Sequence, residues 1–207
     1  MWRAGCDRRL FRKMLLSLII WVLTFSTVST AQVKELKERA QRVMIGYRFV
    51  EQQDFDAYSA AGWKLKWQAN LGKQIGEGIY TTAKPNGWFG KFFCIIYADN
   101  AAFAKAPKVW VPSKHWWKPE IDDFITSLDS KLDPQTTLRM SGIDGSENSL
   151  QMLIPAKMVA EDSLDIFLHC ESTLSGESTF VERPLEYEVN YDGWANVLNP
   201  TDKSQAL

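Results

Sequence analysis

A continuous apolar run, Phe92-Phe93-Cys94-Ile95-Ile96-Tyr97, restricts the fold of this chain more than any other segment. It has the length of a β-strand and contains no charged residue, so it predicts a strand buried on both faces near the centre of a sheet. Lys118–Leu132 supplies an amphipathic helix to cover such a sheet, because its apolar residues recur at helical spacing. The two patterns together favour an α+β domain.

Further segments support this class. We expect a solvated helix over Val33–Arg42, and a short helix that Asp54 caps and Gly62 ends. A turn is expected at Lys84–Gly87, and Ser141–Asn148 is expected to form a loop. The remaining predicted strands are Val43–Val50, Gly78–Thr82, Val109–Val111, Leu150–Pro155 and Ile166–Cys170.

No internal repeat and no proline-rich or serine-rich linker divides the 207 residues. We therefore predict one compact α+β domain over residues 32–201, built from small mixed or antiparallel sheets with flanking helices. Residues 202–207 form a loose C-terminal tail in this prediction.

The N-terminal 31 residues have the pattern of a secretory signal peptide. A basic segment over residues 1–13 precedes the apolar run Met14–Val28, and Ser29-Thr30-Ala31 places small residues before a cleavage site. The alternative is a membrane anchor, but about fifteen residues are too few to cross a bilayer core. We expect a secreted, extracellular protein that starts at Gln32 and has no stable membrane anchor.

The charge of the chain after Ala31 argues against nucleic acid as a partner. That part carries 19 basic and 24 acidic side chains, and no basic cluster. Phosphate backbones are bound by lysine and arginine gathered on one face. We expect no nucleic-acid partner.

Two cysteines, Cys94 and Cys170, follow the signal segment, and in an oxidising compartment they most simply form one disulfide bond. The alternative is a nucleophile pair of Cys170 with His169, but neighbouring residues of a strand point to opposite faces. With only His115 and His169 as further soft ligands, and no short ligand-like spacing, we expect no metal site.

Seven tryptophans also follow Ala31. Trp110 lies in a strand pattern that favours the core, whereas Trp116 and Trp117 lie in an expected loop, where their rings could contact a ligand. Core packing is the alternative for these two rings. A sugar-binding module would need several coplanar rings on one face.

Three segments, Gly46-Tyr47-Arg48, Gly76–Thr82 and Gln151–Pro155, together resemble the ADP-ribosyltransferase superfamily in their order and spacing. The first is similar to the strand end where family members hold the dinucleotide with a histidine or an arginine. Gly76–Thr82 resembles the glycine-x-glycine-aliphatic-tyrosine strand of the diphtheria-toxin and poly-ADP-ribose-polymerase branch, whose tyrosine stacks on nicotinamide. The third is similar to the strand that opens with the catalytic glutamate.

The resemblance implies NAD as the substrate and Arg48, Tyr80 and Gln151 as the catalytic residues. It also implies a nucleotide site lined by Tyr47, Arg48, Gly78, Tyr80 and Thr81. The residue types fit these roles, because Arg48 can pair with a pyrophosphate through two hydrogen bonds and Tyr80 offers a flat ring. The alternatives are structural: a surface ion pair for Arg48, a core position for Tyr80 and a turn for the glycines.

Two departures from the family pattern stand out. Arg48 is typical of one branch and Tyr80 of the other, and Gln151 replaces the catalytic glutamate. A neutral amide keeps a hydrogen bond but cannot stabilise an oxocarbenium-like centre by charge, and such a loss typically costs about 10²–10³-fold in rate. Glu147 lies four residues earlier, roughly 13 Å along a strand, too far to substitute.

From this we expect a monomeric, secreted protein of the toxin or effector type with an ADP-ribosyltransferase-like fold. It would bind NAD and, if active, act as a mono-ADP-ribosyltransferase on a host or competitor protein. The alternative is a catalytically silent effector or interaction protein that uses the fold as a binding platform. Residues 44–160 also resemble small secreted fungal proteins of unknown activity.

Overall fold

The computed structural model describes residues 41–67, 73–85, 90–172 and 188–198, without the side chains of residues 147, 148 and 192. The expected helix over Val33–Arg42 and the signal segment lie outside these ranges, apart from residues 41 and 42, and the turn at Lys84–Gly87 is described only to Pro85. The strands are β1 (Arg42–Val50), β2 (Gly78–Thr82), β3 (Phe92–Asp99), β4 (Lys108–Trp110), β5 (Leu138–Ile143), β6 (Ser146–Pro155), β7 (Phe167–Ser172) and β8 (Val197–Leu198). The helices are α2 (Gln52–Ala60), α3 (Asn100–Lys105), α4 (Ile121–Leu128) and α5 (Ala156–Ala160), with short 3₁₀ turns at Ser113–His115 and Tyr191–Gly193.

The eight strands form one mixed sheet in the order β7-β3-β1-β2-β6-β5-β4-β8, rather than several small sheets. Strand β4 runs parallel to both β5 and β8, and every other neighbouring pair is antiparallel. The predicted α+β class is therefore confirmed. Strands β1 and β2 are joined in register at one residue pair, Tyr47 with Thr82, whereas β1 pairs with β3 over its whole length.

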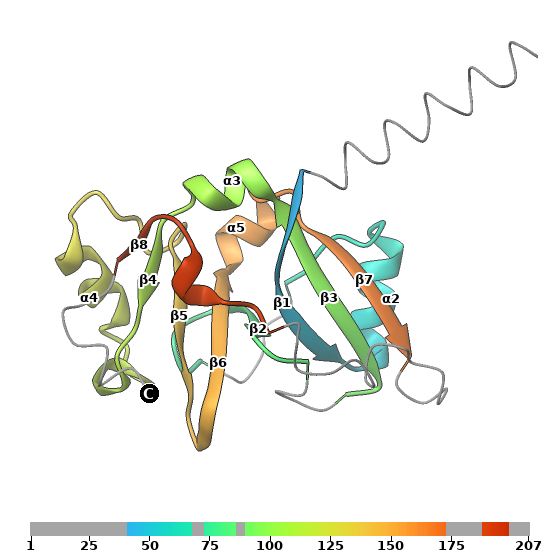
Figure 1. Cartoon of the computed structure of the whole chain (residues 1–207), viewed down its shortest axis with the longest axis horizontal. Helices are drawn as coiled ribbons and strands as arrows, with labels where there is room; N and C mark the ends of the chain where they lie inside the picture. Colours follow the sequence, from blue (N-terminus) through green and yellow to red (C-terminus); the bar gives the residue numbers. More distant parts are fainter. Residues whose placement is uncertain (1–40, 68–72, 86–89, 173–187, 199–207) are drawn as a thin grey trace, which may run out of the picture. The chain divides into compact units, whose positions relative to one another are not determined.

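This weak join divides the sheet into two halves (Figure 1). Helix α2 lies beside the β7-β3-β1 half, and α4 lies at the opposite end, beside β4. Strand β3 buries Phe93 through Ile96, which confirms the predicted buried strand, but it is the second strand from one edge of the sheet and does not lie near its centre.

Two helices differ from their predicted boundaries. Helix α2 begins after Glu51, and Asp54 lies in its first turn instead of capping it, while Gly62 follows its end at φ +68°. Helix α4 spans only Ile121–Leu128 of the expected Lys118–Leu132, because the residues before it form turns that place Trp117 in the left-handed region.

The expected loop at Ser141–Asn148 is wrong. Residues 141–143 end β5 and Ser146 begins β6, so the turn is only Asp144 and Gly145. Of the described side chains in this segment, only Asp144 to Ser146 at the tip of the β-hairpin are exposed, whereas Ser141 is buried, so polar composition did not distinguish the hairpin from a loop. Helices α3 and α5 were not predicted either.

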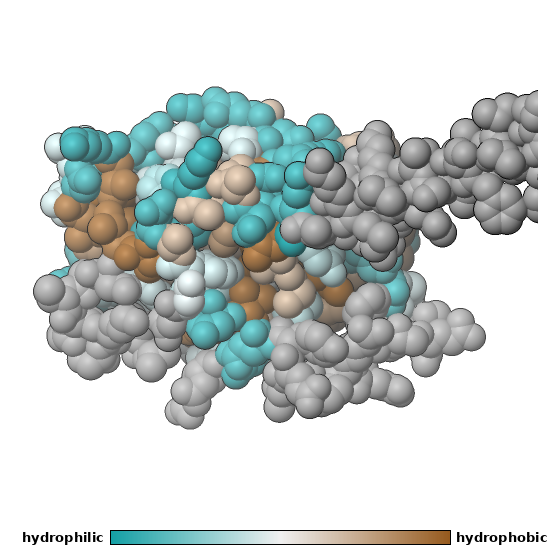
Figure 2. All heavy atoms as spheres, turned by 45° about the horizontal axis from the view of Figure 1, so that its top comes forward, coloured by the Kyte–Doolittle hydropathy of each residue, from teal (hydrophilic) through white to brown (hydrophobic). Residues whose placement is uncertain are grey.

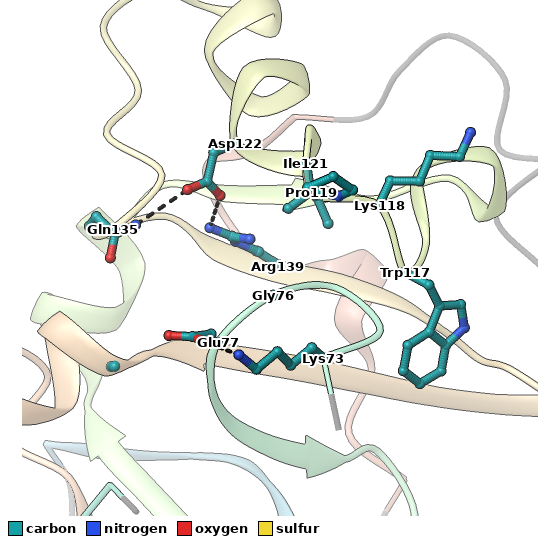
Figure 3. A pocket seen from close by; sticks show the side chains of 11 residues that line it. Lys73, Gly76, Glu77, Trp117, Lys118, Pro119, Ile121, Asp122, Gln135 and Arg139 are labelled. Atoms are coloured by element: carbon teal, nitrogen blue, oxygen red, sulfur yellow. Dashed lines mark hydrogen bonds and ion pairs between the residues drawn. The ribbon is translucent and has the colours of Figure 1, made fainter. Parts of the chain in front are cut away.

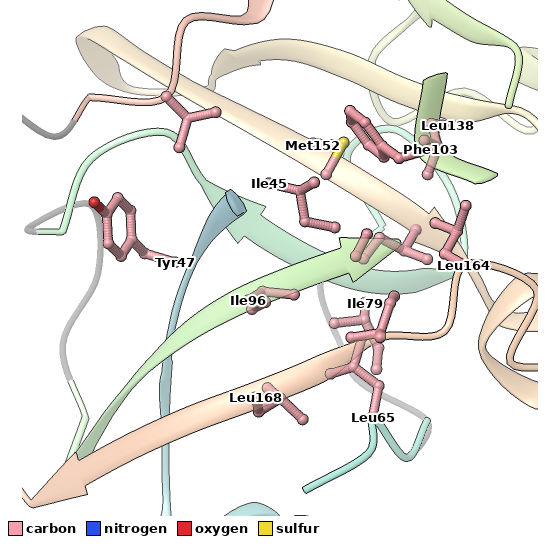
Figure 4. Packing of buried hydrophobic residues seen from close by; sticks show 14 of the residues in the cluster. Ile45, Tyr47, Leu65, Ile79, Ile96, Phe103, Leu138, Met152, Leu164 and Leu168 are labelled. Carbon is pink, nitrogen blue, oxygen red and sulfur yellow. The ribbon is translucent and has the colours of Figure 1, made fainter. Parts of the chain in front are cut away.

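The apolar core has two clusters on the two faces of the sheet. The larger one joins β1, β3, β6 and β7 through residues such as Ile45, Ile96, Met152 and Leu168 (Figure 4). The smaller one lies between α4 and strands β2, β4 and β6. Its buried members are Ile75, Tyr80, Val109, Val111, Ile121, Ile125 and Leu153.

Cys94 and Cys170 lie directly opposite each other on β3 and β7 and form a disulfide bond, which confirms that prediction. A disulfide across neighbouring strands is consistent with folding in an oxidising compartment. Among the described residues, no helix has the length and apolar character needed to cross a membrane.

Candidate functional site at the junction of β1, β2 and β6

The three segments that define the predicted site come together on neighbouring strands. Thr82 of β2 lies opposite Tyr47 of β1 on one side and opposite Gln151 of β6 on the other. Next to this row, Arg48 Nη1 donates a hydrogen bond of 3.0 Å to the backbone oxygen of Tyr80. The segments are separated by dozens of residues in the sequence and meet where the two halves of the sheet join.

Arg48 lies in a nearly buried position, with 14% of its side chain exposed. Its nearest carboxylate is Asp54 of α2, with Nη2 and Oδ2 3.7 Å apart, too far for a hydrogen bond. Its Nε atom and the buried hydroxyl of Tyr58 complete no hydrogen bond among the described residues. The Arg48 charge favours the ionised form of Tyr58, but burial outweighs it and raises the pKa of that phenol. Arg48 thus forms an ion pair with Asp54 that includes no hydrogen bond.

Tyr80 is 5% exposed and belongs to the smaller core cluster under α4. Its hydroxyl accepts a hydrogen bond from the Ile75 N–H and donates one to the Gly76 oxygen, both 2.9 Å long. Burial raises the pKa of this phenol to about 12. The ring is held under the Lys73–Glu77 segment, so a ligand can stack on it only after this segment moves.

Gln151 is 1% exposed. Its amide Nε2 donates to Ser141 Oγ at 3.1 Å and to the Gly142 oxygen at 3.0 Å, both on the neighbouring strand β5. The side chain that replaces the family's glutamate is thus engaged in joining β6 to β5. Its amide hydrogens face two acceptors. An ionised carboxylate in this position would fit poorly, because it has no hydrogen to donate to them.

The other predicted nucleotide-binding residues are packed inside the protein. Tyr47 stacks on Phe93 with ring centroids 5.4 Å apart, and Thr81 is buried with its hydroxyl 3.4 Å from the Met152 oxygen. At Gly78, φ is +154° and an added Cβ would lie 2.2 Å from the Ile154 oxygen. This glycine therefore allows the neighbouring strand β6 to approach closely.

Sequence reasoning missed two residues that organise this region. Gln74 is buried and donates from Nε2 to the Gly142 oxygen at 2.9 Å, while its Oε1 accepts from the Asp144 N–H at 3.0 Å. It therefore fastens the Lys73–Glu77 segment to the β5–β6 hairpin above Gln151. Arg139, 3% exposed, donates from Nη1 to the Ile75 oxygen. Both contacts span more than 60 residues, so no local pattern could have found them.

The tryptophans divide as the sequence suggested only in part. Trp110 is buried, and Trp116 is half-buried with its Nε1 donating to the Val111 oxygen at 3.0 Å. Trp117 is 57% exposed. In the coloured part of Figure 2, hydrophilic residues cover much of the surface, and hydrophobic residues show near its middle and toward the end that carries α4 and β8.

A pocket of about 460 Å³ lies beside Trp117 and Arg139 (Figure 3). Its walls come from the Lys73–Glu77 segment, residues 117–122, Gln135, β5 and the start of α5. It is separate from Arg48 and Gln151, which do not line it. In the described part of the chain, no three histidine, cysteine, aspartate or glutamate side chains are grouped so that they could hold a metal ion.

Residues 73–199 match the model of a protein family described as a family of unknown function, DUF5910. The matched residues include β2 through β8, and with them Tyr80, Gln151 and the pocket, but not Arg48. No curated protein matches the chain.

Proposed function

The chain belongs to the DUF5910 family of unknown function, and we propose that it is a secreted, ADP-ribosyltransferase-like protein that binds NAD without cleaving it. Three observations support the proposal: the convergence of the three motif segments, the state of Arg48 and the environment of Gln151. In this proposal the protein acts by binding, as a catalytically silent effector.

The state of Arg48 is the observation that carries the proposal. The guanidinium lies at the join of the two sheet halves, is nearly buried and has its closest carboxylate at 3.7 Å. Its Nε pairs with no described residue. A guanidinium keeps its charge at any physiological pH, and a planar pair of N–H groups matches a pyrophosphate. An anionic dinucleotide bound here would give this guanidinium a second anionic partner beside Asp54, one to which it could donate hydrogen bonds.

Contact with Tyr80 requires a rearrangement. The phenol is held by Ile75 and Gly76, and Gln74 fastens the same segment to the β5–β6 hairpin. Stacking of nicotinamide on Tyr80 would have to compensate the loss of these hydrogen bonds. We therefore propose Arg48 as the main anchor for NAD and Tyr80 as a contact that forms only when the Lys73–Glu77 segment moves.

The environment of Gln151 supports the proposal that the protein does not transfer ADP-ribose. Cleavage of the nicotinamide–ribose bond builds positive charge on the ribose, and a carboxylate would stabilise that charge. Gln151 carries none, and both of its amide contacts are made within the sheet. Without the carboxylate, the rate would fall by about 10²–10³-fold or more.

Isothermal titration of NAD into the oxidised, secreted protein tests the anchor. We expect saturable binding that weakens at least about tenfold in Arg48→Ala, a loss of about 1.4 kcal/mol. Arg42→Ala is the matched control, because Arg42 lies on the same strand and pairs with Asp165 at the surface. Equal affinity in Arg48→Ala and the unmodified protein, with both folded by circular dichroism, would show that Arg48 is not the anchor.

A further inference from the structure

The pocket beside Trp117 is built from two opposite-charge pairs. Lys73 Nζ contacts Glu77 Oε1 on one side (Figure 3). On the other side, Arg139 Nη2 donates to Asp122 Oδ1 at 2.6 Å. Lys118 also lines the pocket, but its side chain extends away from both pairs. The pocket is thus rich in charged groups and has little net charge.

The donor of one pair is fixed in place. Arg139 is 3% exposed, and its guanidinium also donates to the oxygens of Ile75 and Pro134. It lies against Gly76, where φ is +119° and an added Cβ would be 2.2 Å from Arg139 Nη1. Its Nε has no partner among the described residues.

Acceptors remain at the pocket after these pairs are made. The second carboxylate oxygen of Glu77 and the amide oxygen of Gln135 accept no hydrogen bond from another described residue, whereas Gln135 Nε2 lies 3.4 Å from Asp122 Oδ2. An anionic ligand would meet Glu77 and Asp122 as well as the two cations. A neutral ligand with several hydroxyl groups could donate to the carboxylates and accept from the cations.

Trp117 provides the apolar surface that such a ligand would need. Its ring is exposed, yet its Nε1 donates to Asp144 Oδ2 at 2.9 Å and its backbone N–H donates to the Gln74 oxygen at 2.8 Å. The residue has a φ of +62°, a left-handed conformation that is unfavourable for a residue other than glycine. The protein thus holds an exposed indole ring in a fixed, strained position at the end of the pocket opposite Gln135 (Figure 3).

We propose that this pocket binds a neutral carbohydrate in a cavity with a single stacking ring, and not on a flat face of several coplanar rings. The C–H face of a sugar ring would pack on the indole of Trp117, and its hydroxyls would bond to Glu77, Asp122 and Gln135. A volume of about 460 Å³ falls within the range of small-ligand sites and leaves room for one or two sugar rings. A ring already fixed in place loses little entropy on binding, which favours affinity.

The test uses ¹⁵N-labelled, oxidised full-length protein and four neutral disaccharides: cellobiose, maltose, N,N′-diacetylchitobiose and mannobiose. The indole N–H resonance of Trp117 is assigned by its absence in Trp117→Phe. We expect at least one disaccharide, added to about 20 mM, to shift this resonance saturably. We expect the affinity, followed in each variant by the backbone N–H resonance of the pocket residue Gly76, to fall at least about tenfold in Trp117→Ala and to fall in Gln135→Ala.

Trp67→Ala is the matched control, because Trp67 is an exposed tryptophan outside the pocket lining. This variant should bind the sugar as the unmodified protein does. The proposal is overturned if none of the four disaccharides shifts the Trp117 resonance, or if Trp117→Ala binds as tightly as Trp67→Ala. NAD affinity should be the same in both variants, so failure here is distinguishable from failure of the Arg48 site.

Discussion

Arg48 Nη1 donates a 3.0 Å hydrogen bond to the backbone oxygen of Tyr80, and this bond links two motifs that lie 32 residues apart. The contact forms where β1 and β2 are joined in register only at Tyr47 and Thr82. A strand that pairs over its whole length would place its side chains in a regular ladder. The single pair instead leaves room for the Arg48 guanidinium to reach across to β2.

Replacing Gln151 by glutamate should destabilise the protein rather than restore transfer. The carboxylate would face Ser141 Oγ and the Gly142 oxygen, losing two donated hydrogen bonds in a buried place. We expect a loss of about 2–4 kcal/mol in the free energy of unfolding, measured by urea denaturation. Glu120→Gln, an acid-to-amide change at an exposed site, serves as the control. Wild-type stability in Gln151→Glu, together with nicotinamide release, would contradict the account of this residue.

Gly76→Ala should lower the free energy of unfolding by more than the strain of its positive φ alone would cause. An added Cβ would lie 2.2 Å from Arg139 Nη1, so the buried guanidinium would have to move. Gly145→Ala is the matched control, since Gly145 also has a positive φ, +74°, and no atom near its Cβ position. The control should lose about 1–2 kcal/mol by thermal unfolding. A similar loss in both variants would mean that Arg139 adapts without cost.

Removing the disulfide bond should lower the free energy of unfolding by about 2–4 kcal/mol. The bond joins residues 76 positions apart, and the closed loop restricts the conformations of the unfolded chain. Urea titrations of the oxidised protein and of the double variant Cys94→Ala/Cys170→Ala provide the comparison. A reducing agent should affect only the oxidised protein. Identical midpoints for the two proteins would disprove a stabilising role.

Lys108 should make the stability of the protein depend on alkaline pH. Its side chain is buried, its Nζ donates to the Ala106 and Ala195 oxygens, and burial lowers its pKa from 10.5 to about 8. Between these values the unfolded chain binds more protons than the folded one, so the free energy of unfolding gains a contribution that rises with pH. Relative to Lys108→Met, the protein should become more stable from about pH 8 to about pH 10. A difference in the free energy of unfolding between the two proteins that stays constant over this pH range would contradict the lowered pKa of Lys108.

Local patterns were sufficient for most of the strands. The apolar runs at β1, β3 and β7 and the short β2 predicted nearly the observed bounds, because buried strands need apolar side chains wherever they pair. Helix α3 was missed, although Asp99 precedes it and accepts a hydrogen bond from the Ala102 N–H, a capping signal present in the sequence.

The candidate site was predictable in its segments but not in its environment. Order and spacing selected Arg48, Tyr80 and Gln151, and the fold brings their strands together. The surroundings of Tyr80 and Gln151 include contacts of Gln74 with the β5–β6 hairpin, which lies about 70 residues away in the sequence. The left-handed backbone of Trp117 likewise depends on long-range contacts with Gln74 and Asp144.

The most direct test of the account is a saturation-transfer NMR experiment with NAD at about millimolar concentration, followed for several hours. We predict transfer from the protein to the NAD protons, loss of that transfer in Arg48→Ala, and no free nicotinamide over the whole period. Absence of transfer with the unmodified protein would contradict NAD binding. Accumulation of nicotinamide would contradict catalytic silence and identify the protein as an active enzyme despite Gln151.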